Sequence, residues 1–206
     1  YRWQPVNVFA SVTWPNCTSA VTRTLPITYD WKLYKGITFV ASLTTTSLDR
    51  RYFKLSPYTL DASSTYSLSI TASVTYGLVT ISNYVTGVLQ TGQSSVSAVI
   101  AGASERSANR QDTVILDASG SRDIDYPTAS LTYTWSCFVY SPVYGDPCVG
   151  FSSNQTSKLT IKPLTMAAAT YAINVSVINA AGTVGTAMVR LTLESTRVPA
   201  VAIADT

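Results

Sequence analysis

Apolar and polar residues alternate strictly over the segment 131–135. Leu131, Tyr133 and Trp135 share one parity, and two threonines hold the other. A period of two with aromatic and β-branched residues is typical of a half-buried β-strand. A tryptophan in the middle of such a strand is typical of the core of an immunoglobulin-like sandwich. The segment therefore predicts a sandwich with this strand at its centre.

The same alternation occurs a second time, upstream. Residues 27–31 repeat the pattern of 131–135 at an offset of 104, and residues 66–72 repeat that of 171–177 at an offset of 105. Offsets that drift by a residue are typical of an internal duplication with small insertions. We therefore expect an all-β protein of two tandem immunoglobulin-like β-sandwich modules. The residues expected in the two cores are Tyr29, Trp31, Tyr66, Tyr133, Trp135 and Tyr171.

Short strands separated by turn residues account for each module, and no window has a convincing helical period. An opening strand is expected from Val6 to Trp14. Tyr66 and Tyr171 each open a strand after a corner, which predicts the tyrosine corner, where the ring hydroxyl bonds to upstream backbone. In the second module the strands are expected near 97–103, 113–118, 131–139, 157–162, 170–178 and 184–193.

The short polar stretch 91–95 marks the boundary between the modules. We expect modules at 1–93 and 94–196, with 197–206 as the start of a third module, because Val201–Ala204 resembles the head of the second. The sequence has neither a signal peptide nor an initiator methionine, which predicts a fragment of a longer protein. No apolar run approaches the roughly 18–20 residues that a membrane span needs. Membrane anchoring is therefore expected only through segments outside these residues.

Composition narrows the class of protein. Charged residues make up 12% of the 206 residues, and serine and threonine supply most of the polarity, as in secreted, glycosylated surfaces. The net charge of +3 includes no basic run, which argues against nucleic acid as a partner. The sequence has no histidine, which excludes Ser-His and Cys-His nucleophiles and histidine-bearing zinc sites. We therefore expect no enzymatic activity, no cofactor and no metal.

Asp123 and Asp125 are the nearest approach to a catalytic carboxylate pair. Together with Asp117 they could also offer oxygen ligands to calcium, although the acidic residues are too few for a closed site. No apolar wall beside them in the sequence predicts a raised pKa. A solvated turn is the favoured interpretation, and calcium binding stays open.

Cys137 and Cys148 enclose a loop rich in proline and glycine that follows the tryptophan strand. In an oxidising compartment a disulfide would hold this loop against its own strand, and we expect that bond. Cys17 either pairs outside these residues or stays free.

Aromatic residues in and beside this loop are candidates for a contact surface. They could stack on sugars, or they could pack the loop onto the sandwich. The candidates are Tyr140, Tyr144 and Phe151.

Three sequons predict N-glycosylation of a secreted protein. Asn174 has the parity opposite to the core residues of its strand, so a glycan there would face solvent. The predicted sites are Asn16, Asn154 and Asn174.

Basic residues gather in the first module. Residues 1–95 carry seven basic and three acidic side chains, a net charge of +4, whereas residues 96–206 carry seven and eight, a net charge of −1. A patch there could meet anionic glycans or an acidic partner, or it could be a solvated strand face that prevents sheet edges from aggregating. The residues concerned are Lys32, Lys35, Arg50, Arg51 and Lys54.

The segment 116–125, followed by 131–137, resembles the PKD repeat and resembles still more the receptor-for-egg-jelly (REJ) region of polycystin-like surface proteins. In that family the tryptophan strand ends in Ser-Cys and the loop returns through Pro-Cys, which Pro147 and Cys148 match. The corner 161–171 is also similar to fibronectin type III domains. The resemblance is specific for the second module, and the first is assigned by the repeat spacing.

The resemblance implies a non-catalytic extracellular segment of a large membrane-anchored surface protein, serving as stalk and protein-interaction module. A ciliary or flagellar membrane is one setting that it implies, with a polycystin-like complex as context. Expected partners are other modules of the same ectodomain, a surface or matrix protein, and glycans. The alternative is a carbohydrate- or matrix-binding accessory region of a secreted hydrolase.

Overall fold

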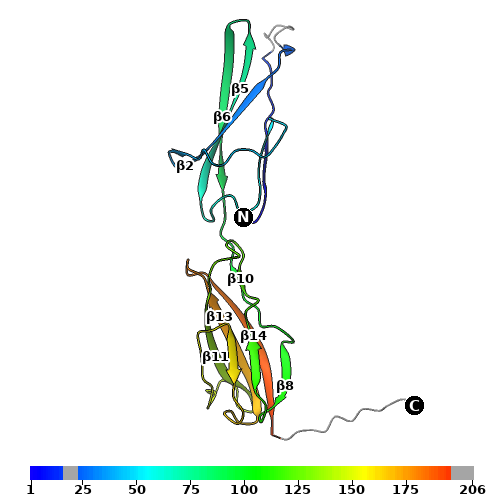
Figure 1. The fold of residues 1–206 in the computed structure, drawn as a ribbon, viewed down its shortest axis with the longest axis vertical. Coiled ribbons are helices and arrows are strands. Elements are labelled where there is room, and N and C mark those ends of the chain that lie inside the picture. The colour runs from blue at the N-terminus through cyan, green and yellow to red at the C-terminus, as the bar shows by residue number, and fades with distance from the viewer. Residues whose placement is uncertain (16–22, 196–206) are drawn as a thin grey trace, which may run out of the picture. The chain divides into compact units, whose positions relative to one another are not determined.

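The computed structural model describes residues 1–15 and 23–195, and the chain divides into two compact units with the boundary between Ser94 and Ser95 (Figure 1). The expected boundary, after residue 93, lies one residue earlier. Asn16, Cys17 and the expected third module at 197–206 lie outside the described residues. Among the described residues, no helix has the length and apolarity to cross a membrane.

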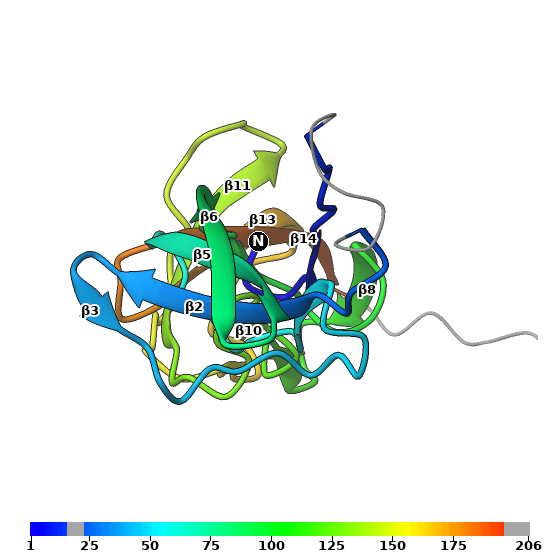
Figure 2. The same cartoon turned by 90° about the horizontal axis from the view of Figure 1, so that it is seen from above.

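The first unit packs a four-stranded sheet on a two-stranded one. Its sheets have the orders β3-β2-β5-β6 and β1-β4, with antiparallel pairing throughout. β5 pairs with β6 along its whole length and with β2 on its other side, and Figure 2 shows these three strands next to one another from above. The strands are β1 (Val6–Phe9), β2 (Thr28–Lys35), β3 (Thr38–Phe39), β4 (Tyr52–Leu55), β5 (Thr65–Tyr76) and β6 (Val79–Gln90).

The second unit repeats this arrangement and adds strands to it. A sheet of order β11-β13-β14-β8 faces the pair β12-β9, and β7 pairs with β10. β8 runs parallel to β14, whereas the other pairs are antiparallel. The strands are β7 (Val96–Ser97), β8 (Glu105–Asn109), β9 (Val114–Asp117), β10 (Arg122–Asp123), β11 (Thr132–Ser141), β12 (Lys158–Ile161), β13 (Ala169–Ile178) and β14 (Val184–Glu194).

Alternation builds the core of the second unit as expected. Trp135 on β11 is 2% exposed, and every second residue of β13 from Tyr171 to Val177 is buried. These side chains pack with Leu116 and Leu159 of the facing strands. Burial of aliphatic and aromatic side chains contributes roughly 1.5–3 kcal/mol each, so this interior is the main source of the stability of the unit.

The first unit has a smaller core. Tyr66 is buried, and Trp31 is half-buried against Leu33 and Phe53. Tyr29 is half-exposed and joins neither core cluster, which corrects the expectation for it. The reason is geometric, because the covering sheet β1-β4 is short and leaves the start of β2 uncovered.

Two kinds of side-chain hydrogen bond occur at equivalent places within each unit. The indole Nε1 of Trp135 donates to the carbonyl of Thr156, and that of Trp31 donates to the carbonyl of Arg50, both at 2.9 Å. At the tyrosine corners, the Tyr171 hydroxyl donates to the carbonyl of Ala167 at 2.9 Å, while the Tyr66 hydroxyl accepts the N–H of Asp61 at 3.0 Å. Each indole N–H is therefore satisfied by backbone downstream of its tryptophan, and each tyrosine hydroxyl by backbone upstream of its tyrosine.

Several strands differ from their expected positions. The expected strand at 97–103 is wrong, because the ladder holds only Val96–Ser97 and the chain then turns, with Gly102 at a φ of +95°. Ile100 is nevertheless buried, since an apolar segment can pack on a core without pairing. The opening strand ends at Phe9 rather than at Trp14, and β8 was not expected from the sequence.

Candidate functional site

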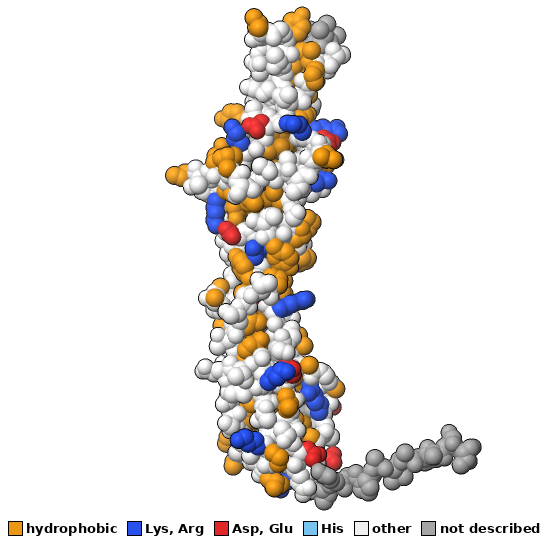
Figure 3. Space-filling view, in the orientation of Figure 1, with side chains coloured by type: hydrophobic (Ala, Val, Ile, Leu, Met, Phe, Trp, Pro, Cys, Tyr) orange, Lys and Arg blue, Asp and Glu red, His pale blue; other side chains and the backbone are white. Residues whose placement is uncertain are grey.

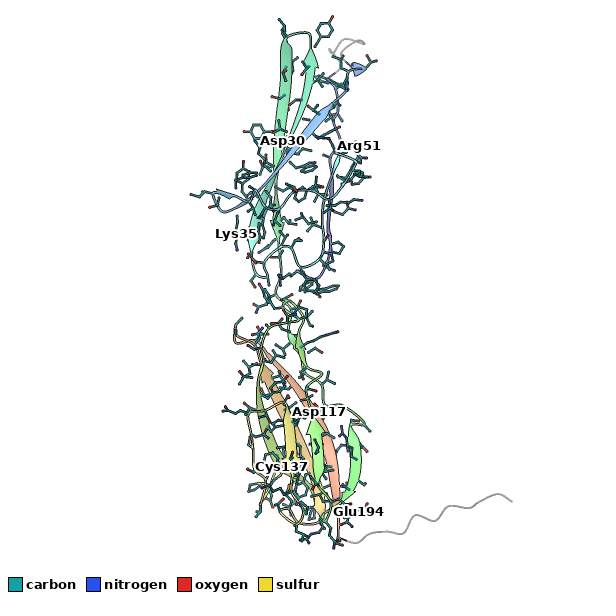
Figure 4. The ribbon with its side chains drawn as sticks, in the orientation of Figure 1. Asp30, Lys35, Arg51, Asp117, Cys137 and Glu194 are labelled. Carbon is teal, nitrogen blue, oxygen red and sulfur yellow. A yellow bond between two sulfur atoms is a disulfide. The ribbon has the colours of Figure 1, made fainter. Side chains whose placement is uncertain are left out.

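The loop that follows the tryptophan strand folds back onto β11. A disulfide joins Cys137 to Cys148, with their Cα atoms 5.8 Å apart (Figure 4). Within the loop, the N–H of Val139 donates to the carbonyl of Asp146 at 2.8 Å, and the N–H of Gly145 donates to the carbonyl of Val139 at 2.9 Å. Backbone pairing and a covalent bond therefore hold the loop in one position.

Three aromatic side chains lie together on the outer side of this strand. Cys137 shares the inward parity of Trp135, so Phe138 points away from the core. Tyr140 lies at the register irregularity between Val139 and Ser141, and its side chain is exposed. The ring of Tyr144, from the loop, meets that of Phe138 at 5.4 Å and that of Tyr140 at 5.8 Å, both edge to face. We call Phe138, Tyr140 and Tyr144 the aromatic cluster. Tyr144 is 71% exposed, so the cluster presents an apolar ring face with a polar hydroxyl to solvent.

Arg190 of β14, a strand of the same sheet, contacts Tyr140 of this cluster. Its guanidinium carbon lies 5.0 Å from the centroid of the Tyr140 ring, and Nη1 donates to the Tyr140 hydroxyl at 3.5 Å. The same guanidinium makes an ion pair with Glu105 of β8 at 2.5 Å. Exposed cation–π contacts contribute about 0.5–1 kcal/mol, so their effect here is to orient Tyr140.

Phe151 does not join the aromatic cluster and follows the second of the two expected alternatives, in which the side chain packs the loop onto the sandwich. Its ring is partly buried and packs with Cys148 against the core of the unit. A phenylalanine has no polar group to satisfy, and burial removes its apolar surface from water. The structure therefore brings Tyr140 and Tyr144 together and places Phe151 against the margin of the core.

Sequence reasoning missed two residues of this surface. Phe138 has the outward parity of its strand, counted from Trp135, so the alternation alone could have identified it. Arg190 lies fifty positions from Tyr140 in the chain, and no local pattern marks it. The pairing of β13 with β14 is what brings it to the cluster.

The aspartates upstream of β11 divide into two kinds. Asp117 is paired across strands with Lys158, at 2.9 Å, and accepts the N–H of Ser119 at 2.8 Å. Hydrogen bonds from Ser119 and Lys158 lower the pKa of this carboxyl to about 2. Asp117 is therefore a carboxylate in all but strongly acidic solution.

Asp123 and Asp125 are each 2% exposed, so the interpretation of a solvated turn is wrong. Oδ1 of Asp123 accepts the N–H groups of Asp125, at 2.8 Å, and Tyr126, at 3.1 Å. Oδ2 accepts Nδ2 of Asn179 at 2.6 Å. These bonds tie the loop to the turn after β13, a structural task for Asp123. Within the described ranges, no three acidic or cysteine side chains are grouped as metal ligands would be.

The basic residues of the first unit do not form one patch. Lys32 alternates with buried Leu33 on β2, and Lys54 alternates with buried Phe53 on β4, so the two lysines point from opposite faces of the sandwich. Arg51 pairs with Asp49 at 2.7 Å. Figure 4 shows Lys35 and Arg51 on different sides of the unit, and Figure 3 shows basic and acidic side chains close together there. A single anionic partner surface is not supported.

The two described sequons lie in the second unit. Asn154 is half-exposed, and its Nδ2 donates to the carbonyl of Lys158 at 3.0 Å. Asn174 is half-exposed on the outer face of β13. Glycosylation at both positions stays a prediction.

Comparison of the fold finds tandem sandwiches of low sequence identity. Three N-terminal domains of the bacteriophage RB49 highly immunogenic outer capsid protein align at 13% identity and a TM-score of 0.40, covering 92% of this chain and 54% of theirs. The fibronectin(III)-like modules of Clostridium thermocellum CbhA align at 12% and 0.37, covering 98% and 92%. The chicken CNTN1 FN1–FN3 domains align at 13% and 0.33, covering 84% and 59%. The chain thus spans about half the length of the three-domain phage chain, and scores this low carry no functional inference.

No curated protein matches the sequence. A family model described as the REJ domain matches residues 9–205, which include strands of both units. Because this match spans most of the sequence, the chain belongs to the REJ domain family.

Proposed function

We propose that this chain is a non-catalytic extracellular segment of a larger membrane-anchored surface protein, where it acts as a spacer and as a protein-interaction module. The observation that carries the proposal is the aromatic cluster, exposed on the outer face of the second unit and held by a disulfide and by Arg190. A polycystin-like complex at a ciliary membrane is the setting in which we place it.

An extracellular, adhesion-type module agrees with two findings. The chain is a REJ domain, and disulfides persist in oxidising compartments and are rare in the cytosol. Both units are β-sandwiches of the kind common in cell-surface proteins.

The chemistry of the aromatic cluster suits protein recognition. Tyrosine offers a large amphipathic contact area and loses little conformational entropy on binding, which is why it is enriched at interface hot spots. Here the entropy loss is reduced further, since Tyr140 packs against Tyr144 and Arg190 before any partner arrives. Truncation of a central hot-spot residue costs about 2 kcal/mol or more in binding free energy.

The test is a binding screen of the whole chain against a panel of purified ectodomains, including the chain itself. Tyr144→Ala is expected to weaken any saturable interaction about thirtyfold. Tyr76→Ala, on the first unit and 65% exposed, is the matched control and should leave binding unchanged. Equal affinities for the parent protein and for Tyr144→Ala would remove the aromatic cluster from the proposal.

A carbohydrate-binding accessory role is the second candidate. Exposed aromatic faces also stack on sugar rings, and the edge-to-face pair of Tyr140 and Tyr144 is the observation that favours it. A glycan array separates the two functions. Saturable binding that is lost in both Tyr140→Ala and Tyr144→Ala would favour the carbohydrate role over the protein-interaction role.

A further inference from the structure

β6 is an open edge of the first unit. It lies at the end of the sheet order and pairs with β5, and within residues 1–15 and 23–195 no strand pairs with its other side. The N–H of Thr91 donates toward β5, to the carbonyl of Ser64 at 2.9 Å. The N–H groups of Val88 and Gln90 have the opposite parity and therefore point away from β5. Such a row of outward backbone groups is a template for an added strand.

The second unit carries a strand at the matching edge. β14 occupies the place of β6, and β8 lies alongside it in parallel (Figure 1). The N–H of Arg190 donates to the carbonyl of Ser104 at 2.8 Å, and the N–H of Arg110 donates to the carbonyl of Glu194 at 3.0 Å. Ala108 of β8 is half-buried against the core. The duplicate module therefore shows both the direction and the register of a strand at this edge.

One hydrogen bond in each unit shows which residue at the start of the first unit corresponds to the end of β8 in the second. The carbonyl of Arg2 accepts the N–H of Tyr58 at 2.8 Å, and the carbonyl of Arg110 accepts the N–H of Leu164 at 2.7 Å. Tyr58 and Leu164 are both left-handed, with φ of 66° and 60°. Arg2 thus takes the place of Arg110, the residue directly after β8.

Tyr1 therefore corresponds to Asn109, the last residue of β8. Asn109 pairs with Glu194 in the second unit. Leu89 and Leu191 each pair with the corner tyrosine of their unit, which puts Gly92 in the place of Glu194. A Cβ at Gly92 would meet the ring of Tyr1 at 3.2 Å. Two separate alignments therefore agree on where a strand joined to Tyr1 would run.

We propose that the β6 edge at Val88–Thr91 is a binding site for one parallel β-strand, supplied by polypeptide joined to the N-terminal side of Tyr1. This strand takes the register that β8 takes on β14. Its alternate N–H groups and carbonyls pair with the outward groups of Val88 and Gln90. The position directly before Tyr1 corresponds to half-buried Ala108, so a small apolar residue fits there.

Two other occupants are outcomes of the test. A second copy of the chain could pair its own β6 edge with this one, and a separate peptide could add in trans. The linked strand is favoured because Tyr1 already sits in register, so its effective concentration far exceeds that of a free strand.

The experiment extends the full chain at its N-terminus with a copy of its own segment 101–108. Amide hydrogen exchange is followed by NMR at Val88 and Gln90, with the N–H of Arg190, already bonded, as internal reference. The matched control carries the same extension with proline at the copies of Arg106 and Ala108. The N–H of Arg110 faces β14. Ala108 and Arg106, two and four residues earlier, have the same parity, so their N–H groups face β14 as well. Proline at these positions removes both donors.

The extension is expected to slow exchange at Val88 and Gln90 at least about tenfold, while the proline control exchanges like the unextended chain. Equal exchange with and without the extension would overturn the proposal, as would equal protection by the proline control. Protection in the unextended chain that is lost on dilution would assign the edge to a second copy. Equal protection by the free peptide at equimolar concentration would assign it to a partner in trans.

Discussion

Removal of the Cys137–Cys148 bond should weaken the second unit alone. The bond closes a segment with a sequence separation of 11. In the chain-entropy relation, a loop of this size lowers the entropy of the unfolded state by about 9 cal/mol/K, which amounts to about 2.8 kcal/mol at 25 °C. The double variant Cys137→Ala, Cys148→Ala is therefore expected to lose about that much of the free energy of unfolding.

Hydrogen exchange by mass spectrometry measures this loss in each unit separately. Peptides from β13, whose Ile173 and Val175 are fully buried, report the global opening of the second unit. Their slowest amides should exchange about a hundredfold faster in the variant, because each 1.4 kcal/mol is a factor of about ten. Peptides from β5 should be unchanged.

Cys17→Ala is the control for loss of a cysteine elsewhere in the chain. A change below about threefold in the β13 peptides would refute the reasoning, because the loop would then not constrain the unfolded chain. An equal acceleration in β5 would refute it in another way, since the bond contacts only residues of the second unit.

Two further predictions test the core and the charges. Trp135→Phe leaves a cavity and an unpaired Thr156 carbonyl, so it should cost about 3 kcal/mol in unfolding free energy. Trp31→Phe, at a half-exposed position, should cost about 1 kcal/mol. Urea titrations followed by circular dichroism compare the two variants, and equal losses would contradict the effect expected from the difference in burial. Asp117 has a folded pKa of about 2 against an ordinary 3.8, so its stabilising effect is complete above about pH 5 and is lost as pH falls toward 2. Asp117→Asn should therefore be less stable than the parent protein at pH 7 and match it near pH 2. A difference in unfolding free energy that persists at pH 2 would contradict this.

Local alternation was enough to predict the strands that carry the core. The alternation from Leu131 to Trp135 lies within five consecutive residues, and β11 forms where this alternation predicts a strand. β8 could not be found in this way, because Glu105–Asn109 holds mostly polar residues and becomes a strand only through its partner β14. The expected strand at 97–103 fails for the converse reason, since its apolar residues pack without a ladder partner.

The candidate site shows the same division between local and distant causes. The disulfide between Cys137 and Cys148 follows from spacing and turn residues. The burial of Asp123 does not, because Asn179, the side chain that satisfies it, lies 56 positions away. Parity could place Phe138 on the outer face, yet only the folded sheet brings Arg190 to the same surface.

The parallel pairing of β8 with β14 also has a mechanical consequence. A force applied before Ser95 and after Glu194 would pull β8 backward and β14 forward along the same axis, because the two strands are parallel. The bonds between Ser104 and Arg190 and between Arg110 and Glu194 then stretch in shear and bear the force together rather than one after another. The second unit is thus built to resist pulling at its ends, and the β6 edge of the first unit, as described, has no such clamp.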